Sequence, residues 1–212
     1  MSSFVYRRNV LRLATVAAAT GSGFAVVGAG QALAEQDPAA QLVQKAADQG
    51  IEVARTNAGA AREAGIRRVL EAFFDLAYMS RATLGSYWNQ ATPEQRQRFL
   101  KASASVEARS YAERFGQYRG QTITVGRISP RENGVSIVDS KLTQISGDPV
   151  TVQWEVRNEG QGPRIVDIRT EGVSMTMTRR ADFVSYIRSH GGQVGPLIDE
   201  LESRAKQRPP AQ

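Results

Sequence analysis

Few side chains in this 212-residue chain could carry out covalent chemistry. The sequence has no cysteine and a single histidine, His190. It therefore lacks a thiol nucleophile, a disulfide and any cysteine ligand for zinc or an iron–sulfur cluster. One histidine is also too few for a usual zinc site. Because His190 precedes the pair Gly191-Gly192, we expect it to end a helix on the surface rather than to act in catalysis.

Carboxylates are the remaining candidates for acid–base chemistry. Those of the second half of the chain fall on predicted strands or turns: Asp139, Asp148, Glu155, Asp167 and Glu171. Two of them could flank a cleft as acid and base. Alternating strands usually turn such residues to solvent, and we favour that interpretation. Asp167 differs, because it stands between two apolar residues, and we expect it to make a structural hydrogen bond.

The first 34 residues have the pattern of an export signal. Arg7, Arg8 and Arg12 precede an uncharged run, 13–34, that ends in Ala-Leu-Ala. This pattern predicts a secretory signal peptide cleaved after Ala34. The run is long enough for an uncleaved membrane anchor, but glycine and polar residues dilute it. The arginine pair resembles a twin-arginine signal, and the general secretory route stays open as an alternative.

The basic charge of the chain belongs largely to this segment. The formal net charge is +6, and half of it comes from the three arginines, which no acidic residue offsets before position 35. The excess that remains after cleavage is too small to indicate a nucleic-acid partner. We therefore expect an exported, periplasmic protein that binds no nucleic acid.

Helical patterns come first in the part that follows. Asp37-Pro38 is typical of a helix start, with an N-cap and a proline in the first turn. Thr92-Pro93-Glu94-Gln95 adds a capping-box glutamine to the same arrangement. The apolar spacing predicts helices at 38–51, at about 62–74, from 75 to about 85, and from 93 to about 118.

After Gly120 the apolar residues alternate with a period of two. Strands are expected at 121–129, 135–144, 150–157, 164–170 and 173–179. Their short polar links indicate an antiparallel meander. Helices at 182–189 and 196–206 close the chain, and we expect the tail 208–212 to be disordered. The prediction is one α+β domain over 35–207, with helices on one face of a four- to five-stranded antiparallel sheet.

Four stretches resemble the MlaC family of periplasmic phospholipid carriers, also called toluene-tolerance proteins. Residues 79–88 resemble its M-x-x-x-x-L-G-x-x-W/Y segment, and residues 91–99 its A/T-x-E-Q-R-x-x-F helix start. Residues 110–121 match its Y-A…Y-x-G-Q passage, and 164–175 its I-x-D-V-x-x-E-G-V-S signature. The resemblance covers about residues 41–206, and the four blocks occur in the family's order.

The resemblance implies a fold of the nuclear-transport-factor or cystatin type that encloses an apolar cavity for phospholipid acyl chains. It also implies a carrier without catalysis or cofactor, expected to be a monomer, that maintains outer-membrane lipid asymmetry. The implied partners are phospholipid, an outer-membrane lipoprotein–porin complex and an inner-membrane ABC transporter with an MCE-domain component. The side chains expected to line the cavity are Phe73, Phe74, Leu76, Met79, Leu84, Trp88, Phe99, Val106, Tyr111, Phe115, Val125, Trp154, Val156, Ile165, Val173 and Met175.

Three alternatives stay open. Residues 102–106 are small where relatives carry Phe or Leu, so the cavity could be wider and hold a bulkier lipid, as in the related hopanoid-associated HpnM branch. An enzyme on the same cone-shaped fold would require Asp139, Asp167 and an arginine to converge in a polar cavity. A ligand-free adaptor on a membrane complex would have a solid core.

Overall fold

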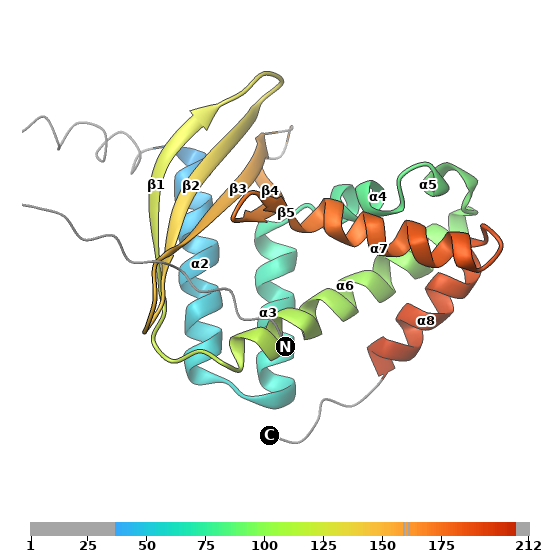
Figure 1. The fold of residues 1–212 in the computed structure, drawn as a ribbon, viewed down its shortest axis with the longest axis horizontal. Helices are drawn as coiled ribbons and strands as arrows, with labels where there is room; N and C mark the ends of the chain where they lie inside the picture. Colours follow the sequence, from blue (N-terminus) through green and yellow to red (C-terminus); the bar gives the residue numbers. More distant parts are fainter. Residues whose placement is uncertain (1–36, 159, 161, 207–212) are drawn as a thin grey trace, which may run out of the picture.

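The computed structural model describes residues 37–158, 160 and 162–206, so the predicted signal peptide and tail lie outside the described residues (Figure 1). Within these described residues, seven helices and five strands follow one another in this order: α2 (Pro38–Thr56), α3 (Gly59–Phe73), α4 (Leu76–Leu84), α5 (Tyr87–Gln90), α6 (Pro93–Phe115), β1 (Thr122–Pro130), β2 (Val135–Thr143), β3 (Val150–Asn158), β4 (Pro163–Thr170), β5 (Val173–Ser174), α7 (Met175–Ser189) and α8 (Val194–Lys206).

Local capping chemistry sets the helix starts that the sequence predicts. The Asp37 carboxylate accepts a hydrogen bond from the Ala39 amide at 2.8 Å, at the start of α2. At the start of α6, Thr92 and Gln95 cap each other's backbone amides in a complete capping box. These bonds satisfy amides that a helix start otherwise leaves without a partner.

The strands form one antiparallel sheet in the order β1-β2-β3-β4-β5, which confirms the predicted meander. Tight turns make this order possible. Between β4 and β5 the two residues Glu171 and Gly172 both have positive φ, 49° and 80°. Two such residues in a row are typical of a type I′ hairpin turn, and glycine adopts this conformation without a steric penalty.

The molecule has two parts, and α6 connects them (Figure 1). In the first part α2 and α3 lie beside the sheet, and α2 contacts β1, β2 and β4. In the second part α4, α5, α7 and α8 gather around the N-terminal half of α6. The arrangement confirms the predicted α+β class with helices against an antiparallel sheet.

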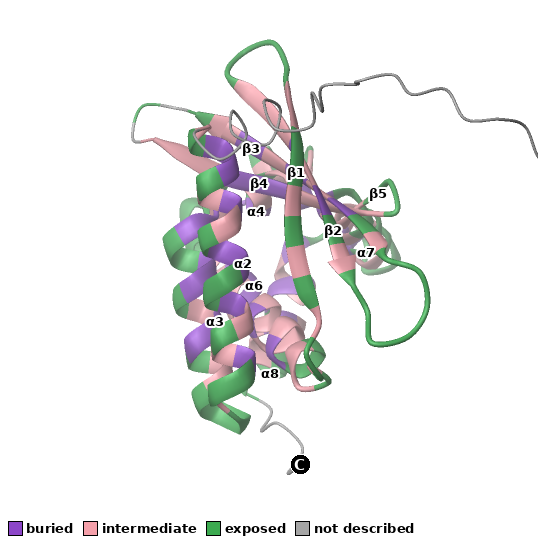
Figure 2. Cartoon of the chain, turned by 90° about the vertical axis from the view of Figure 1, so that its left-hand side faces the viewer, coloured by how far each residue is buried: buried purple, intermediate pink, exposed green. Residues whose placement is uncertain are grey.

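Each part has its own apolar cluster. The first cluster joins the inner face of the sheet to α2, α3 and the C-terminal half of α6, and includes Val43, Phe73, Trp154 and Ile165. Figure 2 shows buried residues along β4 and on the helices beside the sheet, whereas the loop between β1 and β2 is exposed. The indole of Trp154 donates a hydrogen bond of 2.9 Å to the buried hydroxyl of Ser140. Both polar groups therefore have a hydrogen-bond partner inside the cluster.

The second cluster joins α4, α6, α7 and α8. Phe99 of α6 packs edge-on against Phe183 of α7, with ring centroids 5.7 Å apart. Leu84, Ile187 and Ile198 complete the interior and are almost fully buried. Within the described ranges, no helix is both long enough and apolar enough to cross a membrane.

The predicted strand 173–179 is wrong. Strand β5 ends at Ser174, and α7 begins at Met175, well before the predicted helix start at 182. The alternation of Met with Ser and Thr over 174–178 imitates a strand, but two caps favour a helix. The Ser174 hydroxyl accepts a bond from the Met177 amide, and the Asp167 carboxylate accepts one from the Thr176 amide, both at 3.0 Å. The hydrogen bond expected of Asp167 is thus present.

This cap yields a stability prediction. Replacing Asp167 by alanine leaves the buried Thr176 amide without its acceptor, so we expect the free energy of unfolding to fall by about 1–3 kcal/mol. Asp148→Ala, at an exposed turn between β2 and β3, serves as the control and should change stability by less than about 0.5 kcal/mol. Urea denaturation followed by circular dichroism measures both. Equal losses in the two variants would contradict the capping role.

Candidate functional site

A pocket of about 200 Å³ lies between α4, α6 and α7, where the two apolar clusters meet. The six lining residues of α6 recur at spacings of three, four and seven, so they lie on one face of the helix. The lining residues are Leu70, Phe74, Leu76, Met79, Ser80, Thr83, Ser103, Ala104, Glu107, Ser110, Tyr111, Arg114, Met175, Thr176, Thr178, Arg179, Asp182 and Phe183.

Apolar side chains from both clusters form part of the wall. Leu70, Phe74 and Met79 belong to the cluster beside the sheet. Phe183 belongs to the other cluster, where its contact with Phe99 holds the ring. Such a wall offers a water-free surface to hydrocarbon, which is favourable in proportion to the apolar area that both sides bury.

Three hydroxyl groups in the wall bond to carbonyls of their own helices. Thr83 donates to the carbonyl of Ser80, Thr178 to that of Ser174, and Ser103 to that of Leu100, at 2.8–3.2 Å. The hydroxyls of Ser80 and Ser103 also bond to each other at 3.2 Å and so link α4 to α6. Because their hydrogen-bonding capacity is used locally, these residues add little polarity to the pocket.

Charged residues occupy another part of the wall. Arg179 of α7 donates a hydrogen bond of 2.7 Å to the carboxylate of Glu107 on α6. A second carboxylate, that of Asp182, lies 3.9 Å from the same guanidinium. Two carboxylates therefore compensate the positive charge of Arg179. They belong to Glu107 and Asp182, the two acidic residues of the lining.

Tyr111 and Arg114 of α6 lie together in the lining. The guanidinium of Arg114 lies over the Tyr111 ring, 5.8 Å from its centroid. Burial raises the pKa of Tyr111 to about 12, with a further contribution from the Glu107 carboxylate, whereas Arg114 and Arg179 lower it. The phenol is therefore protonated at neutral pH and can donate a hydrogen bond.

Five of the sixteen residues predicted to line a cavity do line this pocket: Phe74, Leu76, Met79, Tyr111 and Met175. Six others pack in or against the cluster beside the sheet: Phe73, Phe115, Val125, Trp154, Val156 and Ile165. Four pack in or against the second cluster: Leu84, Trp88, Phe99 and Val106. The described pocket does not reach these ten residues.

Val173 requires a correction, because this residue is 55% exposed in β5 and does not line the described pocket. Its placement in a cavity followed from the predicted strand 173–179, which the structure replaces with a helix. The same change moves Met175 from the sheet to the first turn of α7, from which it reaches the pocket.

Sequence reasoning missed the polar part of the lining. Glu107, Ser110 and Arg114 line the pocket although they are polar, and an apolar pattern in the sequence gives no sign of them. One signal was present, since Ser103 and Ala104 belong to the run of small residues noted in the long helix. Both line the pocket, where a larger side chain would occupy its volume.

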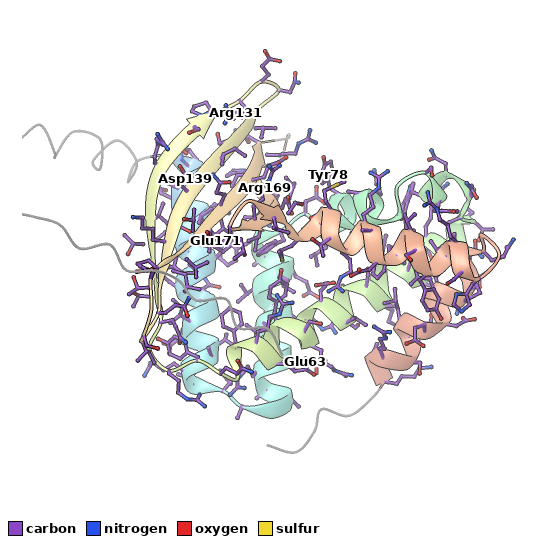
Figure 3. The ribbon with its side chains drawn as sticks, viewed as in Figure 1. Glu63, Tyr78, Arg131, Asp139, Arg169 and Glu171 are labelled. Carbon is purple, nitrogen blue, oxygen red and sulfur yellow. The ribbon has the colours of Figure 1, made fainter. Side chains whose placement is uncertain are left out.

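The carboxylates considered for acid–base chemistry lie elsewhere. Asp139 is on the sheet, 3.4 Å from Arg127 and 2.8 Å from Gln153, and Figure 3 shows it apart from α4 and α7. Asp167 caps α7 as described, so the convergence that an enzyme would need is not found. In the part of the chain that the structure describes, no group of His, Asp or Glu could hold a metal ion. His190 is the C-cap of α7, as expected.

The fold and site define an α+β protein that has an amphipathic pocket between helices, beside a five-stranded antiparallel sheet. The profile of the MlaC protein family matches residues 41–203, and the chain therefore belongs to the MlaC family.

Individual relatives agree with this assignment. The Haemophilus influenzae intermembrane phospholipid transport system binding protein MlaC is 24% identical over 146 residues, which are 67% of each chain. The Pseudomonas putida toluene tolerance protein ttg2D is 25% identical over 135 residues, which are 63% of each chain. A solved structure of a Ralstonia solanacearum phospholipid-binding protein, in complex with a phospholipid, superposes with a TM-score of 0.67. That structure is 23% identical and shares the fold over 80% of this chain and 97% of its own.

Two alanines one turn apart on α6 test whether the pocket is empty space. Ala104 lines it, whereas Ala108 is fully buried in the first cluster. We expect Ala104→Phe to change the free energy of unfolding by less than about 1 kcal/mol, because the ring enters a void. Ala108→Phe should cost about 1–3 kcal/mol or more, because it overpacks a filled interior. Urea denaturation compares the two, and similar losses would mean that no usable space exists beside Ala104.

Proposed function

We propose that this protein is a periplasmic lipid carrier that holds phospholipid acyl chains in the pocket between α4, α6 and α7. The observation that carries the proposal is the amphipathic pocket itself, in a chain of the MlaC family. Its named relatives are a phospholipid transport binding protein and a phospholipid-bound structure, which supports the same ligand class here.

The energetics of lipid transfer explain why such a carrier is useful. Removing hydrocarbon from water is favourable by about 0.8 kcal/mol per methylene. A two-chain lipid with roughly 30 methylenes therefore leaves a bilayer through water extremely slowly. A pocket lined by Leu70, Phe74, Leu76 and Phe183 replaces the membrane interior with protein side chains during the transfer. This function needs no covalent chemistry and no cofactor.

The pocket must enlarge when a lipid enters. A cavity of about 150 Å³ holds one benzene molecule, so 200 Å³ accommodates only a segment of an acyl chain. The wall is suited to enlargement, because it lies where two separately packed clusters meet. At the pocket, a hydrogen bond between the hydroxyls of Ser80 and Ser103 joins α4 to α6, and losing it on opening would cost about 0.5–1.5 kcal/mol.

The transport context is part of the same proposal. We infer that the chain is exported by the predicted signal peptide and moves lipid between an outer-membrane complex and an inner-membrane ABC transporter with an MCE-domain component. The names of the relatives, which include an intermembrane transport protein and a toluene tolerance protein, support this context.

A bulkier lipid is the second candidate ligand. The small residues Ser103 and Ala104 both line the pocket, on the helix that forms one of its sides. With a larger residue at either position the space would be narrower. A hopanoid or another fused-ring lipid would use this width better than a single acyl chain.

Lipid recovery after purification without detergent tests the proposal. We expect mass spectrometry of an organic extract to show phospholipid bound to the wild-type protein. Ala104→Trp should lose most of this lipid, because the indole fills the pocket. Glu113→Trp carries the same new side chain at an exposed site of the same helix and should keep it. Circular dichroism confirms that both variants fold.

Two results would contradict the proposal. One is a wild-type protein that carries no lipid after expression in the periplasm. The other is an Ala104→Trp variant that retains as much lipid as Glu113→Trp. Recovery of hopanoid masses in preference to phospholipid, from a host that makes both, would favour the second candidate ligand.

A further inference from the structure

The charges of the pocket wall are unevenly paired. Of the four charged lining residues, Glu107, Arg179 and Asp182 form one ion-pair group, with distances of 2.7 and 3.9 Å to the guanidinium of Arg179. Among the described residues, no carboxylate lies within ion-pair distance of the fourth, Arg114. An uncompensated cation therefore faces a pocket whose other cation is neutralised.

The position of Arg114 keeps its guanidinium available. The residue lies in the last turn of α6, and its side chain is exposed while also contributing to the pocket wall. Its guanidinium lies over the ring of Tyr111, 5.8 Å from the ring centroid. Ser110 and Tyr111 lie on the same face of α6, about one helical turn before Arg114, and each carries a hydroxyl group.

We propose that Arg114, with the hydroxyls of Ser110 and Tyr111, forms a subsite for the phosphate of a phosphodiester headgroup at the mouth of the lipid pocket. This inference rests on the proposed lipid-binding function and adds the part of the lipid that is recognised. It also sets the orientation of the lipid, with the phosphate at the C-terminal turn of α6 and the chains toward α4.

The chemistry of the three groups suits a phosphodiester. Guanidinium presents parallel N–H donors that match two phosphate oxygens, and such charge-assisted bonds are stronger than neutral ones. The Tyr111 phenol stays protonated at neutral pH, since its pKa is raised to about 12, and it can donate a third hydrogen bond. A neutral lipid with the same chains offers no anion to this subsite.

Two fluorescent probes separate headgroup recognition from chain binding. One is phosphatidylglycerol with a labelled acyl chain, and the other is diacylglycerol with the same two chains. We expect wild-type protein to bind the phospholipid about tenfold more tightly than the diacylglycerol, the contribution of one charge-assisted bond. Arg114→Gln should abolish this preference, so that the ratio of the two affinities falls to about one, while Arg114→Lys should keep part of it.

Matched controls come from the same chain. Arg68→Gln removes an exposed arginine of α3 that does not line the pocket and should leave both affinities unchanged. Glu107→Gln releases Arg179 from its closest carboxylate, so the phospholipid preference should rise rather than fall.

Millimolar inorganic phosphate should not displace the bound phospholipid, because free phosphate lacks the chains. Displacement would assign the subsite to phosphate itself and overturn the headgroup assignment.

The outcomes distinguish the two levels of the argument. If wild-type protein binds neither probe, the proposed lipid-binding function fails, and the subsite fails with it. If it binds both probes equally, or if Arg114→Gln weakens both by the same factor, lipid binding stands and the phosphate subsite is wrong. If Arg114→Gln and Arg68→Gln lowered the preference for phospholipid equally, the net charge of the protein would explain that preference. This result would also overturn the proposal.

Discussion

The division of the apolar core into two clusters is the constraint on which the site depends. Protein interiors are close-packed, so a pocket survives only where neighbouring elements cannot fill the space between them. Here α6 is shared by both clusters: Phe99 and Ala102 pack with α7 and α8, and Ala108 and Ala112 pack beside the sheet. Between these positions the helix carries Ser103 and Ala104, which are too small to close the gap. The pocket lies there because each cluster is complete without it.

The opposite wall depends on how the chain leaves the sheet. The turn at Glu171 and Gly172 reverses the chain after β4, and the caps from Asp167 and Ser174 start α7 within a few residues. These caps direct Met175 and Arg179 toward α6 instead of extending the sheet. Polar contacts at the sheet edge thus place the α7 side of the pocket, which supplies six of its eighteen lining residues. The segment that resembles the family's E-G-V-S signature therefore forms the turn after β4 and the cap of α7, which its sequence alone does not indicate.

The wall that results combines apolar side chains with charged groups that are mostly paired. Three of its hydroxyls bond to their own helices, and its two carboxylates pair with Arg179, so these polar groups have little capacity left to bind a ligand. This combination suits a molecule that is mostly hydrocarbon with one charged end. It does not suit acid–base chemistry, which requires a titratable group free to exchange a proton with a substrate.

The sequence alone determined what short-range physics controls. Proline and side-chain caps marked the starts of α2 and α6, period-two alternation marked β1 to β4, and short polar links implied the antiparallel order. It failed over 173–179, where alternating Met, Ser and Thr suited a strand, whereas the Ser174 cap and the distant Asp167 carboxylate together favour a helix. The tertiary structure alone decided the lining. Trp154, Phe99 and Phe74 look alike in a list of apolar residues, yet only Phe74 lines the pocket. Arg98 and Arg114 lie on one helix, but Arg98 meets Asp199 and Glu202 of α8 while Arg114 faces the pocket. Such differences depend on which distant elements pack against each face, and no local pattern encodes that packing.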